Sequence, residues 1–137
     1  MGVTYRWHGD DVMKVIRKNT TKSVARAAVY TQGVMRKVLS RSGQGRKHYG
    51  MSYKSSAPGQ PPTVQTGTLR RSVQADFRNL QKRNPRARVG PGVFYARFLE
   101  EGTSRMRPRP FRDLTIRKAR PMILRFFGPR YIMRGLY

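Results

Sequence analysis

The sequence predicts an α+β fold in which a long N-terminal helix packs on a small antiparallel β-sheet, accompanied by a short helix, a C-terminal helix, an extended loop and a tail. Two patterns support this prediction. Residues 10–40 repeat apolar or small side chains at the 3.6-residue period of a helix, whereas residues 72–77 and 86–90 alternate polar and apolar side chains as strands do. The length of 137 residues indicates a single domain over 1–137.

The long helix is expected over residues 10–40. Asp10 and Asp11 lie at its start, where a carboxylate caps free N–H groups and stabilises the positive end of the helix dipole. The polar stretch 19–21 is the place where the helix is expected to bend or break, because Asn and Thr are weak helix formers. Gly43 is suited to the left-handed position that follows a helix end.

Residues 43–65 are predicted to form an extended loop, because they are rich in Gly, Ser, Pro and Gln and show no periodicity. The glycines at the start of this segment superficially suggest a phosphate-binding loop. However, His48 stands at the third glycine position, and no apolar strand precedes the segment. A flexible basic loop is therefore the favoured interpretation.

Residues 66–120 are expected to be the α+β core that carries the motifs. Thr66 is a good N-cap for a short helical turn that runs through Arg71. The two predicted strands follow and are joined across residues 79–85, with one face buried and the other basic. A short amphipathic helix is then expected around residues 94–99.

Glycine and proline mark the boundaries of the last elements. Gly102 is expected to end the short helix, and an extended Arg/Pro connector follows over 105–110. The last helix is predicted from Phe111 to Arg120, because Pro121 is expected to stop it. The remaining residues, 121–137, form an apolar and aromatic tail in which Met122 to Phe127 resemble a strand.

The charge of the chain is extreme. Thirty Lys and Arg residues stand against six Asp and Glu residues, which gives a formal net charge of +24, and each part of the sequence carries an excess of cations. Self-repulsion of this size must be offset by anions, by a polyanionic partner or by acidic neighbours. Nucleic acid is the natural candidate, because neutralised phosphates release counterions. A basic protein that is merely soluble is the alternative.

Several protein classes do not fit the composition. The chain contains no cysteine, so disulfides and thiolate metal sites are excluded and a cytosolic origin fits. The N-terminus lacks the apolar stretch of a signal peptide. The longest apolar clusters are far too short to span a bilayer, so no membrane partner is expected.

No catalytic, cofactor or metal site is predicted, and the protein is not expected to be an enzyme. His8 and His48 have no partner at metal-ligand spacing. Glu100 and Glu101 are adjacent on a predicted helix, where neighbouring side chains point about 100° apart, so they do not face one substrate as paired carboxylates. These glutamates are expected to accept charge-assisted hydrogen bonds from arginine, within one subunit or across an interface, although an ordinary solvated pair is the alternative.

Arginines cluster beside the sequence segments that are richest in Gly, Pro and aromatic residues. They are Arg70, Arg71, Arg105, Arg107 and Arg109. The guanidinium group suits both phosphate and carboxylate. These residues are therefore candidates either to line a DNA passage or to join subunits, and both possibilities remain open.

Four short motifs occur in order along the chain. They are Pro58 to Pro62, Thr66-Gly67-Thr68-Leu69, Tyr95-Ala96 through Glu100-Glu101-Gly102-Thr103, and Arg109-Pro110-Phe111. Together, over residues 56–119, they resemble the HK97 gp10-like family of tailed-phage neck and tail-completion proteins. The residues that carry the resemblance are Pro61, Thr66, Gly67, Leu69, Tyr95, Gly102, Thr103, Pro110 and Phe111. Gln65 stands where the family commonly has Asp.

The resemblance implies a structural virion protein, a head–tail connector that forms a homo-oligomeric ring around the DNA channel. A sixfold ring is favoured and a twelvefold ring is the alternative. The implied partners are adjacent head-closure or adaptor proteins, tail-terminator or tail-tube proteins, and the double-stranded DNA that passes through. The implied location is the neck of the virion, after assembly in the host cytoplasm.

Two expectations follow for the neck protein and its alternative. The loop over 43–65 and the tail over 122–137 are expected to act as interface arms, because a ring requires contacts between different patches of neighbouring subunits. The competing class is a free-standing basic nucleic-acid-binding protein, which would be a monomer or dimer that binds nucleic acid tightly by itself.

Overall fold

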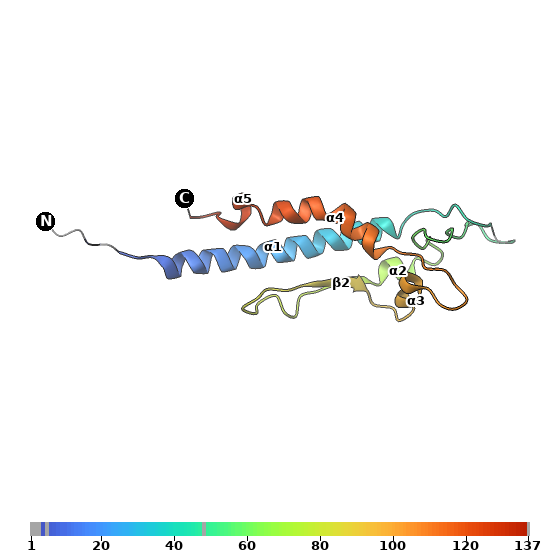
Figure 1. Cartoon of the computed structure of the whole chain (residues 1–137), viewed down its shortest axis with the longest axis horizontal. Coiled ribbons are helices and arrows are strands. Elements are labelled where there is room, and N and C mark those ends of the chain that lie inside the picture. Colours follow the sequence, from blue (N-terminus) through green and yellow to red (C-terminus); the bar gives the residue numbers. More distant parts are fainter. Residues whose placement is uncertain (1–3, 5, 48, 137) are drawn as a thin grey trace.

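The computed structural model describes residues 4, 6–47 and 49–136. Its elements in chain order are α1 (Gly9–Val38), α2 (Thr68–Arg71), β1 (Val73–Asp76), β2 (Arg88–Pro91), α3 (Ala96–Glu101), α4 (Arg112–Phe126) and α5 (Pro129–Ile132). Helix α1 runs along the molecule, with α4 and α5 on one side of it and the sheet, α2 and α3 on the other (Figure 1). The predicted α+β class, with its long N-terminal helix and small antiparallel sheet, is confirmed.

Helix α1 has almost the predicted limits, but its start differs from the expectation. The N-cap residue is His8, and no side chain caps this end. Asp10 and Asp11 lie inside the first turn, where their charge still favours the positive end of the helix dipole. The expectation that Asp10 or Asp11 is the N-cap is therefore wrong by two or three residues.

The expected bend in the middle of α1 is absent, since the helix is continuous through residues 19–21. The hydroxyl of Thr20 donates to the carbonyl of Ile16 at 2.8 Å, and that of Thr21 donates to the carbonyl of Arg17 at 3.0 Å. Because these hydroxyls bond back to the preceding turn, they do not compete for the helical N–H groups.

Gly43 does not adopt the left-handed conformation that was predicted after the helix. Its role is close packing, because a Cβ at this position would overlap the backbone carbonyl oxygens of Lys54 and Ser55. The loop folds back on itself here: the N–H of Gly45 donates to Ser55 at 2.8 Å, and the N–H of Ser55 donates to Arg46 at 3.0 Å. The two halves of the loop are thus hydrogen-bonded to each other, while the loop as a whole projects from the end of the molecule (Figure 1).

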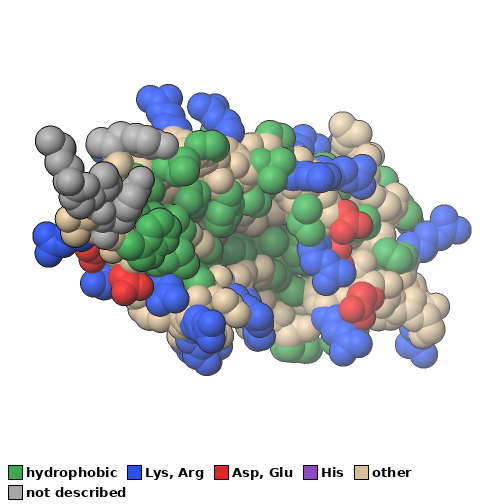
Figure 2. Space-filling view, turned by 60° about the vertical axis from the view of Figure 1, so that its left-hand side comes forward, with side chains coloured by type: hydrophobic (Ala, Val, Ile, Leu, Met, Phe, Trp, Pro, Cys, Tyr) green, Lys and Arg blue, Asp and Glu red, His purple; other side chains and the backbone are tan. Residues whose placement is uncertain are grey.

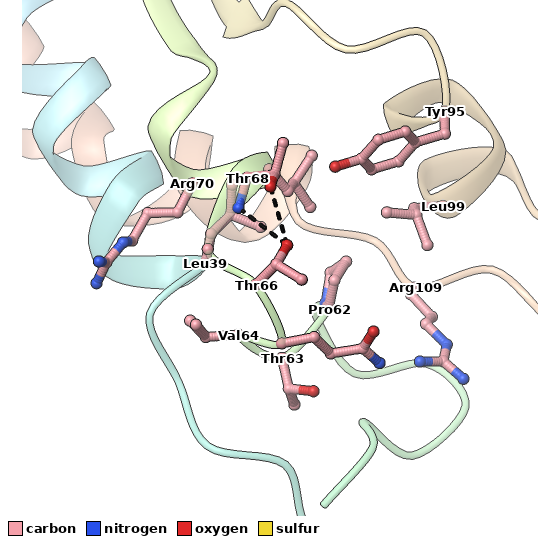
Figure 3. A pocket seen from close by; sticks show the side chains of 13 residues that line it. Leu39, Pro62, Thr63, Val64, Thr66, Thr68, Arg70, Tyr95, Leu99 and Arg109 are labelled. Carbon is pink, nitrogen blue, oxygen red and sulfur yellow. Dashed lines mark hydrogen bonds between the residues drawn. The ribbon is translucent and has the colours of Figure 1, made fainter. Parts of the chain in front are cut away.

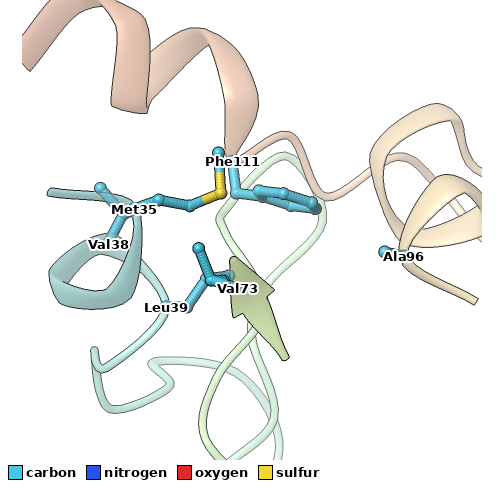
Figure 4. Packing of buried hydrophobic residues seen from close by; sticks show 6 residues of the cluster. All are labelled: Met35, Val38, Leu39, Val73, Ala96 and Phe111. Atoms are coloured by element: carbon cyan, nitrogen blue, oxygen red, sulfur yellow. The ribbon is translucent and has the colours of Figure 1, made fainter. Parts of the chain in front are cut away.

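The hydrophobic core lies at the C-terminal end of α1. Its buried members are Met35, Val38, Leu39, Val73, Ala96 and Phe111. Figure 4 shows the side chain of Met35 beside the ring of Phe111. Gln32 and Arg36 of α1 also donate to the backbone carbonyl of Val73, at 3.0 and 2.8 Å. The first strand is therefore fixed to α1 by both apolar packing and hydrogen bonds.

The two predicted strands are confirmed. β1 and β2 pair antiparallel, with Val73 opposite Pro91 and Asp76 opposite Arg88. A two-stranded ribbon is marginal by itself in water, and this one is stabilised by packing against α1.

Helix α4 corrects the prediction for the end of the chain. It continues through Pro121 as far as Phe126, so neither the helix end at Arg120 nor the strand over residues 122–127 is present. Pro121 removes the hydrogen bond that the carbonyl of Arg117 would otherwise accept. Both residues are exposed, so water can satisfy that carbonyl. The boundary expected between the core and the tail thus falls inside a helix.

The tail lies against α1 of the same chain. Asn19 donates from Nδ2 to the carbonyls of Ile132 and Arg134, each at 2.9 Å. The Phe126 ring makes edge-to-face contacts with Tyr30 and Tyr131. Within the monomer, the tail is therefore a folded part of the helical layer and does not extend as an arm.

Candidate interaction site

The two motif-bearing stretches meet around one pocket of about 270 Å³ (Figure 3). Its lining consists of Leu39, Pro62, Thr63, Val64, Gln65, Thr66, Gly67, Thr68, Leu69, Arg70, Tyr95, Leu99 and Arg109. The first stretch provides one wall, and Tyr95, Leu99 and Arg109 face it from α3 and the connector. Motifs about 30 residues apart therefore form a single surface feature. Pro61 is half-buried next to this pocket but does not line it.

The turn into α2 depends on glycine. Gly67, and not Thr66, is the N-cap residue of α2. Its left-handed φ of 74° is one that residues with a side chain rarely adopt. A Cβ on Gly67 would also lie 2.9 Å from a guanidinium nitrogen of Arg71. Thr66 supports the turn from one position earlier, because its Oγ1 bonds to the hydroxyl of Thr68 at 2.9 Å. The next motif residue, Leu69, packs against the core.

Two arginines present guanidinium groups at the pocket. Arg109 is half-buried and donates to the hydroxyl of Ser56 at 2.6 Å, while its backbone N–H donates to the carbonyl of Leu99 at 2.8 Å. Arg70 is exposed and donates to Ser40 at 3.3 Å. Both side chains bond to neutral hydroxyls, so their positive charge is available to a carboxylate or phosphate.

Glu100 fixes the start of α4. Its Oε2 accepts the backbone N–H groups of Phe111 and Arg112, at 2.9 and 3.1 Å, and its side chain is 11% exposed. The Arg112 guanidinium lies 3.8 Å from the other oxygen. These contacts connect the glutamate motif with the Arg-Pro-Phe motif, because Phe111 is the N-cap residue of α4. Pro110 precedes it and is half-buried.

Glu101 has a different environment from its neighbour. It accepts from Arg97 at 2.9 Å, one helical turn earlier, and its side chain is 54% exposed. The Glu101 carboxylate raises the pKa of Arg97 through this hydrogen bond. The two glutamates therefore act separately, each with an arginine of its own chain.

Gly102 turns the chain from α3 into the connector. Its φ is 79°, and a Cβ there would lie 2.8 Å from the carbonyl oxygen of Met106 and 2.9 Å from the nitrogen of Pro108. Thr103 and Met106 then exchange backbone hydrogen bonds of 2.8 and 3.2 Å. Only glycine meets both the conformational and the steric requirement at this position.

The remaining arginines of the predicted site are not gathered in the pocket. Arg71 lies over Gly67, and Arg105 and Arg107 are exposed on the connector. Sequence reasoning did not include Ser56 or the pocket wall formed by Leu39. The Pro-rich motif beside Ser56 was the available signal, but its position next to Arg109 depends on the folded loop.

Positive side chains predominate on the face drawn in Figure 2. They lie along much of its outline, around a hydrophobic centre, with few acidic groups between them. Within the described residues, ion pairs join Asp11 to Lys14 and Asp76 to Arg78, in addition to the two glutamate pairs. Because six acidic residues face thirty cations, most of the cations have no carboxylate to neutralise them.

The described part of the chain offers no group of three or more His, Cys, Asp or Glu side chains arranged to hold a metal ion. None of its helices combines the length and apolar character needed to cross a membrane. The side chains gathered at the motif pocket are hydroxyls, guanidinium groups, apolar groups and the amide of Gln65, which suit binding of an anionic or apolar partner.

The family model described as "Bacteriophage HK97-gp10, putative tail-component" matches residues 8–102, which is more than half of the chain. The chain belongs to this HK97 gp10-like family. It is therefore a structural component of a bacteriophage tail, and its place is in the virion. Comparisons with curated proteins and with solved structures gave no match.

The family match and the motif resemblance cover different ranges. The HK97 gp10-like model includes α1, the loop, the sheet and α3, and it ends at Gly102. Thr103 and the Arg109-Pro110-Phe111 motif lie beyond it. In this chain Glu100 joins the matched region to that later segment, because its carboxylate accepts the backbone N–H groups of Phe111 and Arg112.

Proposed function

We propose that this HK97 gp10-like protein is the subunit of a homo-oligomeric ring in the phage neck. The ring joins or completes the tail at the head–tail interface and surrounds the DNA channel. A sixfold ring is favoured over a twelvefold one. Its axial neighbours are head-closure or adaptor proteins on one side and tail-terminator or tail-tube proteins on the other, and assembly takes place in the host cytoplasm.

The observation that carries this proposal is a pair of exposed apolar surfaces on opposite sides of α1. On the sheet side, Phe94 is 84% exposed and Phe98 of α3 is 49% exposed. On the other side, Leu124 of α4 is 61% exposed and Ile116 is 52% exposed. Figure 1 places α3 and α4 on the two sides of α1. Two different patches on opposite sides suit a ring, because one patch of each subunit meets a different patch of the next.

The motif pocket lies on the sheet side of α1, the side that carries Phe94. Its two guanidinium groups, from Arg70 and Arg109, supply polar recognition next to that apolar patch. Interfaces commonly combine an apolar centre with arginine at the edge. In this proposal, the residues of the family motifs form part of the surface through which one subunit contacts the next.

The oligomeric state of the purified protein tests the proposal. Native mass spectrometry and negative-stain microscopy at moderate salt should show closed rings. Phe94→Ser and Leu124→Ser should each shift the protein to monomers, because each removes one half of the contact. Met13→Ser, which changes an exposed apolar residue near the start of α1, is the matched control and should leave the rings intact.

A wild-type protein that stays monomeric or dimeric at all concentrations would contradict the ring. If that monomer also binds duplex DNA tightly, the free-standing nucleic-acid-binding protein becomes the better description. The net charge of +24 is the observation that favours this second function.

A further inference from the structure

A cationic groove of about 480 Å³ lies between the N-terminal half of α1 and the C-terminal tail. It is lined by Val15, Lys18, Asn19, Lys22, Arg26, Tyr131, Arg134 and Gly135. Four of these residues are cations, all exposed, and none is acidic. The groove is separate from the motif pocket, which is lined by no residue of α1 itself and only by Leu39 just after its C-terminal end.

The α1 cations form a regular row. Lys18, Lys22 and Arg26 are each four residues apart, so they share one face of the helix with a spacing of about 6 Å along its axis. Like charges at this spacing repel and destabilise a helix. A row about 12 Å long is therefore most stable when an extended anion lies along it.

The opposite wall of the groove is the C-terminal tail, which Asn19 of α1 holds in place. Asn19 binds the carbonyl oxygens of Ile132 and Arg134 at 2.9 Å, which fixes the backbone from which the Arg134 side chain projects. The guanidinium of Arg26 lies 5.6 Å from the centre of the Tyr131 ring, within range of a cation–π contact. The groove is thus built by two segments more than 100 residues apart in sequence.

We propose that this groove binds the phosphate backbone of the duplex DNA that passes through the ring. The choice of duplex DNA rests on the proposed function. The inference adds that this groove is the surface of the subunit that faces the DNA. The nearest acidic group on α1, Asp11, is already paired with Lys14 at 3.2 Å, so it does not oppose the row. An open groove with aligned cations suits a long polyanion better than a single ion.

The loop that joins the two strands provides a matched comparison. Lys82, Arg83 and Arg86 are also exposed cations, but they share their surface with the carboxylate of Asp76. Neutralising three cations at either place lowers the net charge equally. Any difference in DNA binding between the two variants therefore reports position and not total charge.

The experiment measures binding of a fluorescent 20-base-pair duplex by anisotropy across a series of NaCl concentrations. The triple variant K18Q/K22Q/R134Q should reduce the slope of log K against log salt by about 2.7, since each lost phosphate contact removes about 0.9. The loop variant K82Q/R83Q/R86Q should reduce it by less than about 1. Equal reductions, or a larger one for the loop variant, would overturn the assignment.

Asn19→Ala provides a test at unchanged charge. It removes both bonds that hold the tail, so DNA affinity should fall severalfold while circular dichroism shows an intact helical fold. Unchanged affinity would contradict the role of the tail in forming the groove.

Competition with inorganic phosphate tests the kind of anion that binds. At millimolar concentration it should displace the DNA only weakly. Complete displacement by it would identify a free-phosphate site instead.

Native mass spectrometry of the same groove variant separates this inference from the proposed function. Intact rings with a reduced salt slope support both. Intact rings with an unchanged slope overturn the groove alone. Absence of rings in the wild-type protein, together with a reduced slope in the groove variant, overturns the ring and leaves the groove as the nucleic-acid surface.

Discussion

The carboxylate of Glu100 shows how one side chain of a motif stabilises structure far from it in sequence. It accepts two backbone N–H groups at the start of α4, eleven and twelve residues further on, and it is almost buried. Helix starts have unpaired N–H groups and a positive dipole end, so a negative acceptor there is favourable. The adjacent Glu101 has no such role, because it lies on the exposed face with Arg97.

Glu100→Ala should therefore lower the free energy of unfolding by about 1–2 kcal/mol, the usual cost of losing an N-terminal cap. Urea denaturation followed by circular dichroism at neutral pH measures the change. Glu101→Ala is the control and should have a much smaller effect, since exposed ion pairs contribute little. Equal destabilisation by the two variants would contradict the capping role.

Asp76 gives a pH-dependent prediction at the same scale. The Arg78 side chain and backbone N–H bond to its carboxylate and lower the pKa of Asp76 from 3.8 to about 2. Because the folded-state pKa is depressed, this contribution to stability is present above about pH 3.8 and is lost as the pH falls towards 2. Titration of the carboxyl resonance by NMR should give a midpoint near 2, and Arg78→Gln should return it towards 3.8.

At the scale of elements, periodicity predicted those parts of the fold in which local pattern and tertiary packing agree. The apolar spacing of α1 and the alternation in β1 and β2 gave their limits to within a few residues. The predicted helix end at Pro121 is wrong because the rule that proline ends a helix is local. Whether the freed carbonyl can reach water depends on which face of α4 is buried, and that is decided by the packing on α1.

The candidate site was predictable only in part for the same reason. Gly102 was expected to end α3, since its conformational freedom can be inferred from residue type and place. The pocket that joins Thr66 to Tyr95 and Arg109 requires contacts between distant segments, and no local pattern specifies them. The groove beside α1 could not be predicted from local patterns, because it includes Arg134, whose position next to α1 depends on how the tail folds.

The position of Pro121 inside α4 leads to a prediction about the stability of this helix. Pro121→Ala restores a helical N–H at an exposed site, so it should raise the melting temperature. The gain in stability should approach the cost of about 3 kcal/mol for proline inside a helix. Calorimetry measures it. Pro129→Ala is the control: this proline lies in the first turn of α5, where proline is tolerated, so no gain is expected.

At the scale of the whole molecule, the C-terminal tail contributes both to the monomer fold and to the proposed contact between subunits. It covers α1 within the monomer through Asn19, and it presents two exposed apolar residues, Phe127 next to Leu124 and Met133 further on. The monomer fold and the proposed contact between subunits thus share this segment. Its removal should affect them unequally, because the core cluster lies elsewhere.

A chain that ends at Gly128 keeps α4 whole and tests this directly. It should remain folded, with cooperative thermal unfolding, since Val38, Leu39 and the rest of the core are retained. Ring assembly should be impaired, as judged by native mass spectrometry. Complete rings from the shortened chain would show that the tail is dispensable for assembly.

The position of the core at one end of α1 divides the chain into two regions of unequal resistance to opening. Around Met35 and Leu39 the helix is enclosed by the sheet, α3 and α4, so opening there requires global unfolding. Near Asn19 the helix is held by the tail through two hydrogen bonds. Amide hydrogens there should exchange with solvent through local fluctuations, faster than those at the core end. In the proposed ring, each subunit would thus adjust one end to its neighbours while the other keeps its shape.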